Sequence, residues 1–211
     1  MIAIIDYKAG NLTSVERAFH HIGAKCTVTS DPAVISTCDR IVFPGVGAAG
    51  AAMESIRRLG IDCALQDAFR AQKPILGICL GTQIIMEHSE ENNTLCLGLV
   101  PGNVLSFEPD RPDADGNRLK IPHMGWNTVD VQKPHPLLNH ITPQDTFYFV
   151  HGYYPAPTNP AHILATTEYG VQFASTLGFK NLVATQFHPE KSGEVGLAML
   201  RNFLTWSSET D

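Results

Sequence analysis

The chain lacks any excess of basic residues, which argues against nucleic acid as a partner. Its 211 residues include 15 Lys and Arg against 21 Asp and Glu, a formal net charge of -6. Such a chain has no global positive field to attract nucleic acid or an anionic membrane surface. Only 17% of the residues are charged and 44% are hydrophobic, so we expect residues 1–211 to form one globular domain.

The sequence also lacks a CxxC pair and a long apolar run at its start. Five cysteines, an odd number without a CxxC pair, argue against a disulfide framework and a zinc site. The nine histidines show no metal-ligand constellation, so we expect no metal and no other cofactor. The opening MIAIIDYKAG has no basic segment and reaches Asp6 after four apolar residues, unlike a signal peptide or a membrane span. These absences predict a protein of the reducing cytoplasm.

The first half of the sequence alternates short apolar runs with helical periodicity. The predicted strands are residues 2–5, 25–29, 40–43 and 75–78. The predicted helices are residues 12–22, 48–59 and 62–71. Asn11 is a candidate cap for the first helix and Gly23 is its expected end. This order predicts an α/β fold with a mostly parallel open sheet flanked by helices on both faces.

The pattern changes after about Leu95. As far as Leu177 the chain is rich in Pro, Gly, Thr and aromatic residues, and the runs NTVDVQ and DTFYFV are typical of antiparallel strands. The stretch 109–120 is an expected exposed loop or hairpin. Strand character returns at 181–187, and 194–206 has the spacing of a closing amphipathic helix. We therefore expect an antiparallel extension of the parallel sheet.

The stretch LGICLGTQ places Cys79 between a predicted strand and a predicted helix that begins near Gly81. This strand–turn–helix layout is typical of a nucleophile elbow, where a tight turn needs small flanking residues such as Gly77 and Gly81. A helix amino terminus behind the sulfur would favour the thiolate. A buried core cysteine before a helix is the plain structural alternative.

Two further stretches carry candidate chemistry. In QFHPEKSG, strand alternation would place His188 and Glu190 on one side of a sheet, so that the carboxylate orients an imidazole able to activate Cys79. In VFPGVGAAG, a glycine-rich turn could present backbone N–H groups to an oxyanion or a phosphate, although it lacks the residues of a Walker loop. A surface His and Glu pair and an ordinary turn are the structural alternatives. All three stretches follow predicted parallel strands, where open α/β sheets place their active sites.

Together, GICLGTQ, FHPEKS and PGVG resemble the class I, triad-type glutamine amidotransferases. The stretches IIDYKAGNLTSVERAF, IPHMGWN and YFVHGYY extend the resemblance over nearly the whole chain. They are similar to the glutaminase subunits of imidazole glycerol phosphate synthases, which act in histidine biosynthesis. The resemblance therefore implies the fold of that class and hydrolysis of L-glutamine to glutamate and ammonia.

The resemblance also implies roles for individual residues. Cys79 would attack the glutamine carboxamide, His188 would relay protons and Glu190 would orient His188, through a glutamyl thioester. The implied oxyanion hole consists of the backbone N–H groups of Val46 and Leu80. The implied contacts to bound glutamine are Gly47, Gln83, Gly152 and Tyr153.

A partner follows from the same resemblance. The subunits of this family dock on a (β/α)8-barrel cyclase that consumes the ammonia, and 211 residues leave no room for that barrel, so a heterodimer is expected. The positions that match the docking face are Asn11, Trp126, Tyr148 and Lys191. A helix cap, two half-buried strand aromatics and a solvated charge are their structural alternatives.

The sequence departs from the family pattern at three places. Ala48, Ala49 and Gly50 stand where an aromatic residue is common, Thr82 stands where Met is common, and Gly152 replaces a usual Ser or Thr. Three other functions stay open at this point. They are a paralogue that feeds ammonia to surface-sugar amidation or pyridoxal phosphate synthesis, a non-catalytic regulatory subunit, and a cysteine peptidase of similar fold.

Overall fold

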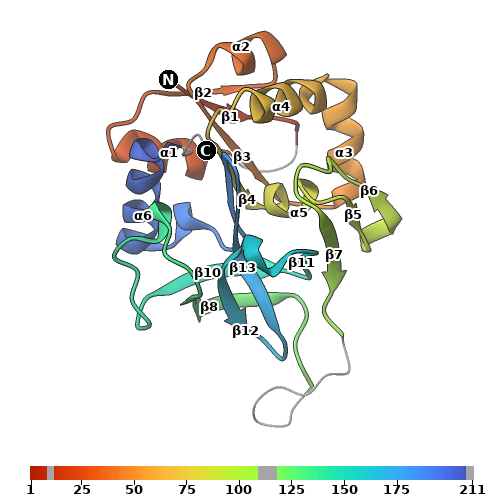
Figure 1. Cartoon of the computed structure of the whole chain (residues 1–211), viewed down its shortest axis with the longest axis vertical. Coiled ribbons are helices and arrows are strands. Elements are labelled where there is room, and N and C mark those ends of the chain that lie inside the picture. Colours follow the sequence, from red (N-terminus) through yellow and green to blue (C-terminus); the bar gives the residue numbers. More distant parts are fainter. Residues whose placement is uncertain (9–11, 109–117, 208–211) are drawn as a thin grey trace.

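An eight-stranded sheet runs through the computed structural model, which describes residues 1–8, 12–108 and 118–207 (Figure 1). Its order is β2 (Cys26–Thr29), β1 (Ile2–Ile5), β3 (Arg40–Gly45), β4 (Ile75–Cys79), β14 (Leu182–Thr185), β13 (Gln172–Phe179), β12 (Ile163–Glu168) and β9 (Asp130–Val131). Neighbouring strands from β2 to β14 are parallel, and β13, β12 and β9 continue the sheet in antiparallel pairs. The expected α/β fold with an antiparallel extension is confirmed.

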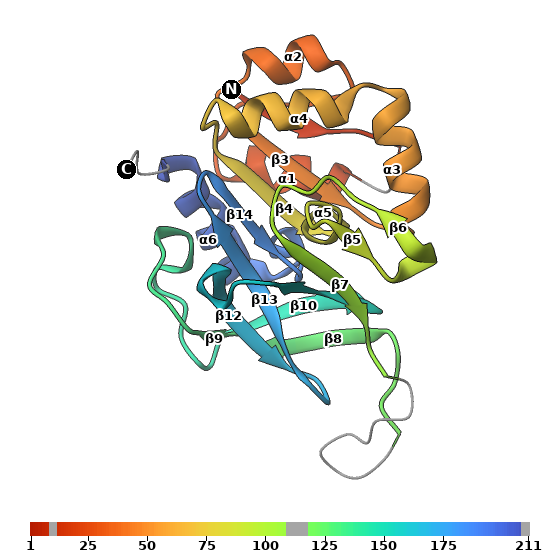
Figure 2. The ribbon, with the colours of Figure 1, turned by 45° about the vertical axis from the view of Figure 1, so that its right-hand side comes forward.

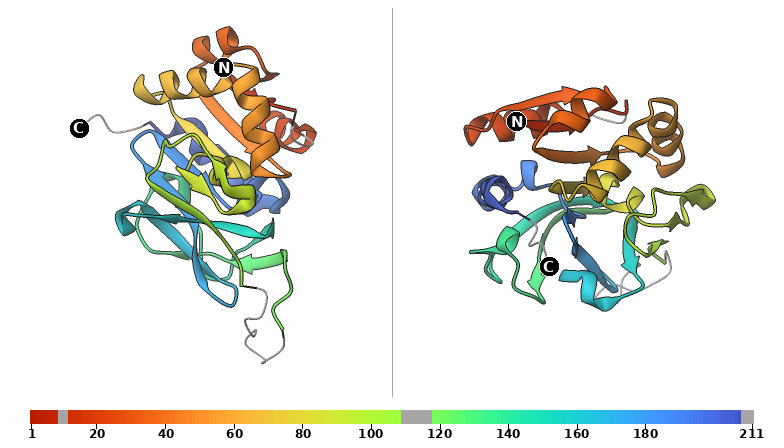
Figure 3. Two further views of the ribbon diagram at one scale, coloured as in Figure 1. Left: turned by 90° about the vertical axis from the view of Figure 1, so that its right-hand side faces the viewer. Right: turned by 45° about the horizontal axis from the view of Figure 1, so that its top comes forward.

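Helices cover both faces of the parallel strands. The helices are α1 (Thr13–His21), α2 (Pro32–Thr37), α3 (Ala49–Arg58), α4 (Ile61–Arg70), α5 (Leu80–Ile84) and α6 (Gly193–Thr205). Phe19 of α1 and Phe203 of α6 pack with Ile4 on one face, whereas Met53 of α3 and Leu65 of α4 belong to the core on the other. Figures 2 and 3 show α6 on one side of the parallel strands and α3 and α4 on the other. Because both faces are covered, β1 and β4 are buried throughout, which explains their unbroken apolar runs.

Two smaller sheets lie beside the large one. β8 (His123–Thr128) and β10 (Thr146–His151) form an antiparallel pair. A four-stranded sheet has the order β11 (Tyr153–Pro157), β7 (Gly102–Ser106), β5 (His88–Ser89) and β6 (Thr94–Leu95). Gly152 separates β10 from β11, so the chain passes from one small sheet to the other at this residue. The short 3₁₀ helices are η1 (Glu91–Asn93), η2 (Pro136–Leu138), η3 (Pro160–His162) and η4 (Pro189–Lys191).

The helices predicted over 12–22, 48–59, 62–71 and 194–206 are confirmed to within about two residues. Gly23 follows α1 with a φ of 78°, the left-handed conformation expected after a helix. Asn11 and most of the predicted loop 109–120 lie outside the described residues. Among the helices of the described ranges, none has the length and hydropathy that a membrane crossing requires.

Three secondary-structure expectations were incomplete or wrong. The sequence did not predict α2, because six residues are too few to show a repeating helical pattern. At its start, Asp31 Oδ1 caps the helix by accepting a hydrogen bond of 2.9 Å from the Ala33 N–H. NTVDVQ is not one strand, because β8 ends at Thr128 in the two-stranded sheet, whereas β9 (Asp130–Val131) belongs to the eight-stranded sheet. The strand expected over 181–187 is limited to Leu182–Thr185.

Candidate active site

The carboxyl ends of three neighbouring parallel strands meet at one edge of the large sheet. In the register of β3, β4 and β14, Gly45 lies opposite Cys79 and Ile78 lies opposite Thr185. The glycine-rich loop after β3, the cysteine at the end of β4 and the segment after β14 are therefore neighbours. The sequence predicted this convergence because open α/β sheets place active sites at this edge.

Cys79 occupies a strained turn between β4 and α5. Its φ of 53° and ψ of -107° lie in a region that non-glycine residues rarely adopt, at a typical cost of about 1–3 kcal/mol. A Cβ on Gly81 would lie 1.8 Å from the carbonyl oxygen of Phe43, and one on Gly77 would lie 2.9 Å from the Ala184 Cβ. Both glycines are thus required by close packing, as the sequence predicted. The helix that follows is only five residues long, so its dipole is weaker than expected.

His188 and Glu190 form a buried pair. The Nδ1 of His188 is 2.7 Å from Oε1 of Glu190, and the two side chains are 3% and 4% exposed. The sequence reasoning placed both on a strand, which is wrong: β14 ends at Thr185, and Pro189 begins the 3₁₀ helix η4. His188 is held there by its own N–H, which donates to the Tyr148 carbonyl at 2.9 Å, and by its carbonyl, which accepts from Ser192 Oγ at 2.6 Å.

The charge balance around His188 favours a protonated ring. Burial alone would lower the pKa of His188, but the neighbouring Cys79 and Glu190 outweigh it and raise that pKa to about 10. Glu190 engages Nδ1, and the other ring nitrogen, Nε2, is buried without a hydrogen-bond partner. In the neutral ring Nε2 is therefore the atom that accepts the thiol proton of Cys79, and the protonated ring that results is the form that the raised pKa favours.

A cavity of about 320 Å³ opens beside the Cys79 sulfur. The residues predicted for the oxyanion hole and for glutamine contact all line it, namely Val46, Leu80, Gly47, Gln83, Gly152 and Tyr153. Leu80 is the first residue of α5, and an N–H at that position has no partner within a helix. The structure thus brings these predicted residues together around one thiol.

Gln83 and Gln186 are fixed beside the nucleophile. The Gln83 Nε2 donates to the Tyr153 carbonyl at 2.8 Å and to Gln186 Oε1 at 3.2 Å. Gln186 Nε2 in turn lies 3.8 Å from the Cys79 sulfur. Sequence reasoning missed Gln186, although it stands within QFHPEKSG two residues before His188.

Glu91 also lines the cavity and was missed by the sequence analysis. Its Oε2 accepts a hydrogen bond of 2.6 Å from the backbone N–H of Ala49, at the start of α3. The residue before it, Ala48, has no side chain able to cap that helix, so Glu91 supplies the cap from 42 residues further along the chain. No local pattern reveals a contact of this sequence separation.

The structure shows how two departures from the family pattern fit. The Thr82 hydroxyl is fully buried and donates to the Thr185 carbonyl at 2.6 Å, so it ties α5 to β14. Gly152 has room for a side chain, since a Cβ there would meet only Ile121 Cγ2, at 3.7 Å.

Three of the four predicted docking residues form one patch. Trp126 is 58% exposed and faces Tyr148 across β8 and β10, with ring centroids 5.9 Å apart. Lys191 Nζ lies 5.8 Å from the centroid of the Tyr148 ring, which is 6.4 Å from that of His188. Trp126 is therefore not half-buried, and Lys191 is not an isolated solvated charge. The fourth residue, Asn11, lies outside the described residues.

Across residues 1–8, 12–108 and 118–207, no group of three or more His, Cys, Asp or Glu side chains is arranged to hold a metal ion. The chemistry available at this edge of the sheet is that of a thiol, an imidazole, a carboxylate and backbone N–H groups.

The sequence matches the profile of the family Glutamine amidotransferase class-I over residues 3–206. A relative described as imidazole glycerol phosphate synthase subunit HisH, from Nitratidesulfovibrio vulgaris, is 50% identical over 209 residues, which are 99% of this chain and 98% of that protein. A relative of the same description from Desulfovibrio desulfuricans is 49% identical, over 100% of this chain and 96% of its own length.

Solved structures share the fold at much lower identity. A structure of PurLQS from Thermotoga maritima has a TM-score of 0.72 at 17% identity and covers 96% of each chain. A structure described as glutamine amidotransferase has a TM-score of 0.73 at 14% identity and covers 97% of each chain. These likenesses support the fold alone.

Proposed function

The chain belongs to the class I glutamine amidotransferase family, and on this premise we infer that it is the glutaminase subunit of an imidazole glycerol phosphate synthase in histidine biosynthesis. One observation carries the inference: the chain is 50% identical, over nearly its whole length, to a protein described as such a subunit. The buried His188–Glu190 pair beside Cys79 supports an active enzyme rather than a purely regulatory subunit.

We propose that Cys79, His188 and Glu190 form the catalytic triad. His188 Nε2 takes the thiol proton, and the sulfur attacks the carboxamide carbon of glutamine. The oxygen of the resulting tetrahedral adduct carries a negative charge, which the backbone N–H groups of Val46 and Leu80 stabilise. The charged Glu190 keeps His188 oriented and stabilises its protonated form.

The rest of the cycle releases ammonia and then glutamate, and it returns His188 and Cys79 to their starting protonation states. His188 passes the thiol proton to the departing nitrogen, so ammonia leaves and a glutamyl thioester forms on Cys79. His188 then takes a proton from water, whose oxygen attacks the thioester carbon, and glutamate departs as the thiol is restored. The balance is glutamine plus water to glutamate plus ammonia.

Substrate binding follows from the cavity walls. We propose that Gly47, Gln83, Gly152 and Tyr153 contact the glutamine, as the family resemblance implies. Glu91 adds a negative charge to the same wall, and glutamine carries a positive α-ammonium group, so we propose that the two pair.

We propose that the partner is a (β/α)8-barrel cyclase chain, which docks on the patch of Trp126, Tyr148 and Lys191. An exposed aromatic beside a cation is typical of an anchoring position in protein interfaces. Ammonia in bulk water becomes protonated and is lost as a nucleophile, so direct transfer to the cyclase is a chemical requirement. The five cysteines are all unpaired, which supports a reducing compartment and hence the cytoplasm.

The test is glutamate release by the chain mixed with such a barrel, with and without the substrate of the barrel, the ribotide that accepts the ammonia. We expect strong stimulation that needs both, and loss of activity in Cys79→Ala. Cys96→Ala, another buried cysteine, is the matched control and should stay active. Activity retained by Cys79→Ala would exclude this mechanism, and stimulation only by a barrel of another pathway would reassign the chain to a paralogous synthase.

A further inference from the structure

We propose that His123 and His151 are positioning residues that, as a pair of fixed tautomers, hold the Tyr153 carbonyl and so orient Gln83 at the glutamine pocket. The functional meaning of that pocket rests on the proposed glutaminase activity. The contacts of the pair itself do not depend on that activity.

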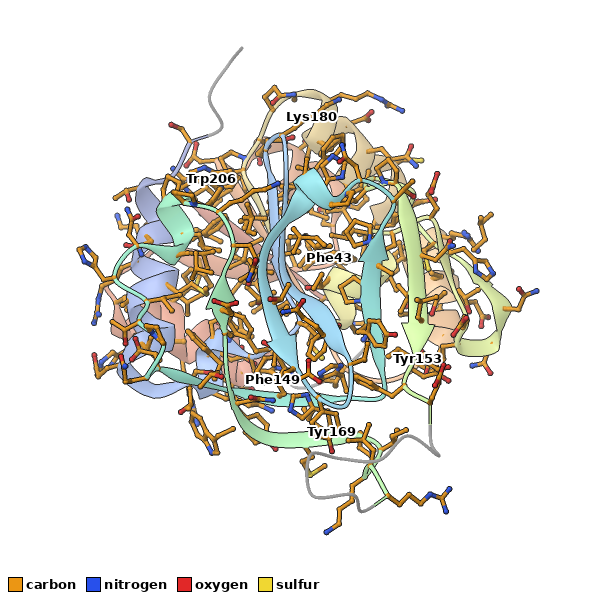
Figure 4. The ribbon with its side chains drawn as sticks, turned by 60° about the horizontal axis from the view of Figure 1, so that its bottom comes forward. Phe43, Phe149, Tyr153, Tyr169, Lys180 and Trp206 are labelled. Atoms are coloured by element: carbon orange, nitrogen blue, oxygen red, sulfur yellow. The ribbon has the colours of Figure 1, made fainter. Side chains whose placement is uncertain are left out.

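The two histidines face each other inside the protein. They are directly opposed in the register of β8 and β10, and they are 3% and 5% exposed. The His123 ring is stacked between Tyr169, with centroids 3.9 Å apart, and Phe149, with centroids 4.8 Å apart. Figure 4 shows these two aromatic residues close together below the long strands. The stacking fixes the plane of the ring, so its nitrogens can only interact edge-on.

One end of the pair is set by Asn127. Its Oδ1 accepts from the Thr128 N–H at 2.8 Å, so its amide nitrogen is the atom that faces His123. That nitrogen donates to the Glu168 carbonyl at 2.9 Å and lies 3.3 Å from His123 Nε2. An amide nitrogen can only donate, so Nε2 of His123 must be the unprotonated acceptor and Nδ1 must carry the hydrogen.

The other end is set by Tyr153. His151 Nδ1 lies 2.8 Å from the Tyr153 carbonyl, which can only accept, so this nitrogen carries a hydrogen. In a neutral ring His151 Nε2 then carries no hydrogen and can accept a hydrogen bond, and it lies 3.0 Å from His123 Nδ1. Both ends give the same assignment. Every hydrogen bond runs in one direction, from Asn127 through the two rings to the Tyr153 carbonyl.

The assignment requires both rings to be neutral, and their surroundings favour this. Burial lowers the pKa of His123 to about 4 and that of His151 to about 3. A proton added to His151 would place two N–H donors against each other at the 3.0 Å contact. His188 also acts to lower the pKa of His151 when it is charged.

The chain of bonds continues into the active site. The Tyr153 carbonyl accepts from His151 Nδ1 and from Gln83 Nε2, both at 2.8 Å. Gln83 leads on to Gln186, whose Nε2 lies 3.8 Å from the Cys79 sulfur. If His151 turned its bare nitrogen toward Tyr153, two acceptors would face each other and the carbonyl would move away. Gln83 would then lose its fixed orientation.

The first test reads the tautomers in the unmodified protein by ¹⁵N NMR of its histidine side chains at pH 7. We expect both His123 and His151 to be neutral with the hydrogen on Nδ1, the less common form in water. A hydrogen on Nε2 of either ring, or a charged ring, would overturn the proposal. This readout does not depend on any activity.

The second test compares variants that keep or remove a donor, in the complex with the cyclase barrel and its ligand. Asn places an amide nitrogen near the position of histidine Nδ1, whereas Leu fills the apolar space without a donor. We expect His123→Leu and His151→Leu to raise KM for glutamine about tenfold, while kcat stays within about threefold of the value for the unmodified protein. We expect His123→Asn and His151→Asn to keep KM within about threefold.

A purely structural role predicts the opposite order, because Leu suits a buried aromatic pocket better than Asn does. Equal KM values in all four variants, or larger effects of Asn than of Leu, would refute the positioning role. If the Leu variants do not fold, the KM values of the Asn variants and the tautomers of the unmodified protein still test the positioning role. Absence of glutamine hydrolysis by the unmodified complex would count against the proposed function, while the NMR result would still judge the pair.

Discussion

The Glu91 carboxylate accepts a hydrogen bond of 2.6 Å from the backbone N–H of Ala49, two residues beyond Gly47 in the glycine-rich loop. The same side chain lines the cavity beside the Cys79 sulfur. One carboxylate therefore touches both the proposed oxyanion loop and the proposed glutamine pocket, so substrate binding and loop position are linked through it.

Substitutions at Glu91 should separate its two roles. Glu91→Ala removes both the cap of α3 and the negative charge, and we expect it to lower the free energy of unfolding by about 1 kcal/mol and to raise KM for glutamine. Glu91→Gln keeps an oxygen for the Ala49 N–H but removes the charge, so it should raise KM with little loss of stability. Urea unfolding and glutaminase kinetics check both. A normal KM in Glu91→Gln would show that the charge does not bind substrate.

Gly152→Ser should improve glutamine binding. The Cβ has space, 3.7 Å from Ile121 Cγ2, and Gly152 lines the cavity, so the substitution adds a hydroxyl at the cavity wall. We expect KM to fall about threefold or more, with unchanged thermal stability. Gly47→Ser is the matched control on the same cavity, because Gly47 has a φ of 103° that a serine adopts only with strain. An unchanged or higher KM in Gly152→Ser would mean that the backbone alone makes the contact.

Trp126→Ala should weaken binding of the cyclase barrel. Because this side chain is 58% exposed, its truncation should leave stability within about 0.5 kcal/mol while it removes a central anchor of the patch. We expect the Kd to rise at least about tenfold, measured by calorimetric titration. The control is Leu95→Ala, an apolar residue that is 66% exposed on β6. Equal Kd values for Trp126→Ala and the unmodified chain would mean that the barrel docks on another face.

The buried histidines should make the fold sensitive to acid. The pKa values of His123 and His151 are lowered by burial to about 4 and about 3, from an ordinary value of 6.5. Below pH 6.5 the unfolded chain therefore binds protons that the folded chain does not, and the free energy of unfolding falls as the pH decreases. Each group contributes about 1.4 kcal/mol per pH unit well below 6.5.

The measurement is urea unfolding between pH 7.5 and pH 5, for the unmodified chain and the variant with both His123→Asn and His151→Asn. We expect a flatter pH dependence in the variant. His135 and His162 also have lowered pKa values, but they are present in both proteins. The pKa of His188 is raised, so its contribution is complete below pH 6.5 and is lost only as the pH rises toward 10. Equal slopes would contradict the burial argument.

The parallel sheet and the cysteine turn could be predicted from sequence because their causes are local. Strands buried on both faces appear as unbroken apolar runs, as at Ile2–Ile5, and Gly77 and Gly81 mark the turn around Cys79. The placement of His188 and Glu190 near each other was predicted, but for the wrong reason: Pro189 starts a 3₁₀ helix and no strand alternation is involved.

The remaining parts of the site depend on distant pairings that a sequence does not display. Glu91 reaches Ala49 across 42 residues, and His123 meets His151 only through the register of β8 and β10. The two histidines stand in IPHMGWN and YFVHGYY, which carry part of the family resemblance, yet neither stretch reveals that its histidine is buried against the other.

The strands β8 and β10 pair only with each other in the sheets of the described chain. One side of this ribbon carries the exposed Trp126 and its neighbour Tyr148, and the other carries His123 and His151. Side-chain hydrogen bonds rather than strand pairing join this ribbon to the main sheet: Asn127 Nδ2 donates to the Glu168 carbonyl and Thr167 Oγ1 donates to the Thr128 carbonyl, both at 2.9 Å. β10 ends at His151, next to Gly152 and Tyr153 in the wall of the proposed glutamine pocket, so one continuous strand joins the proposed docking patch to that pocket.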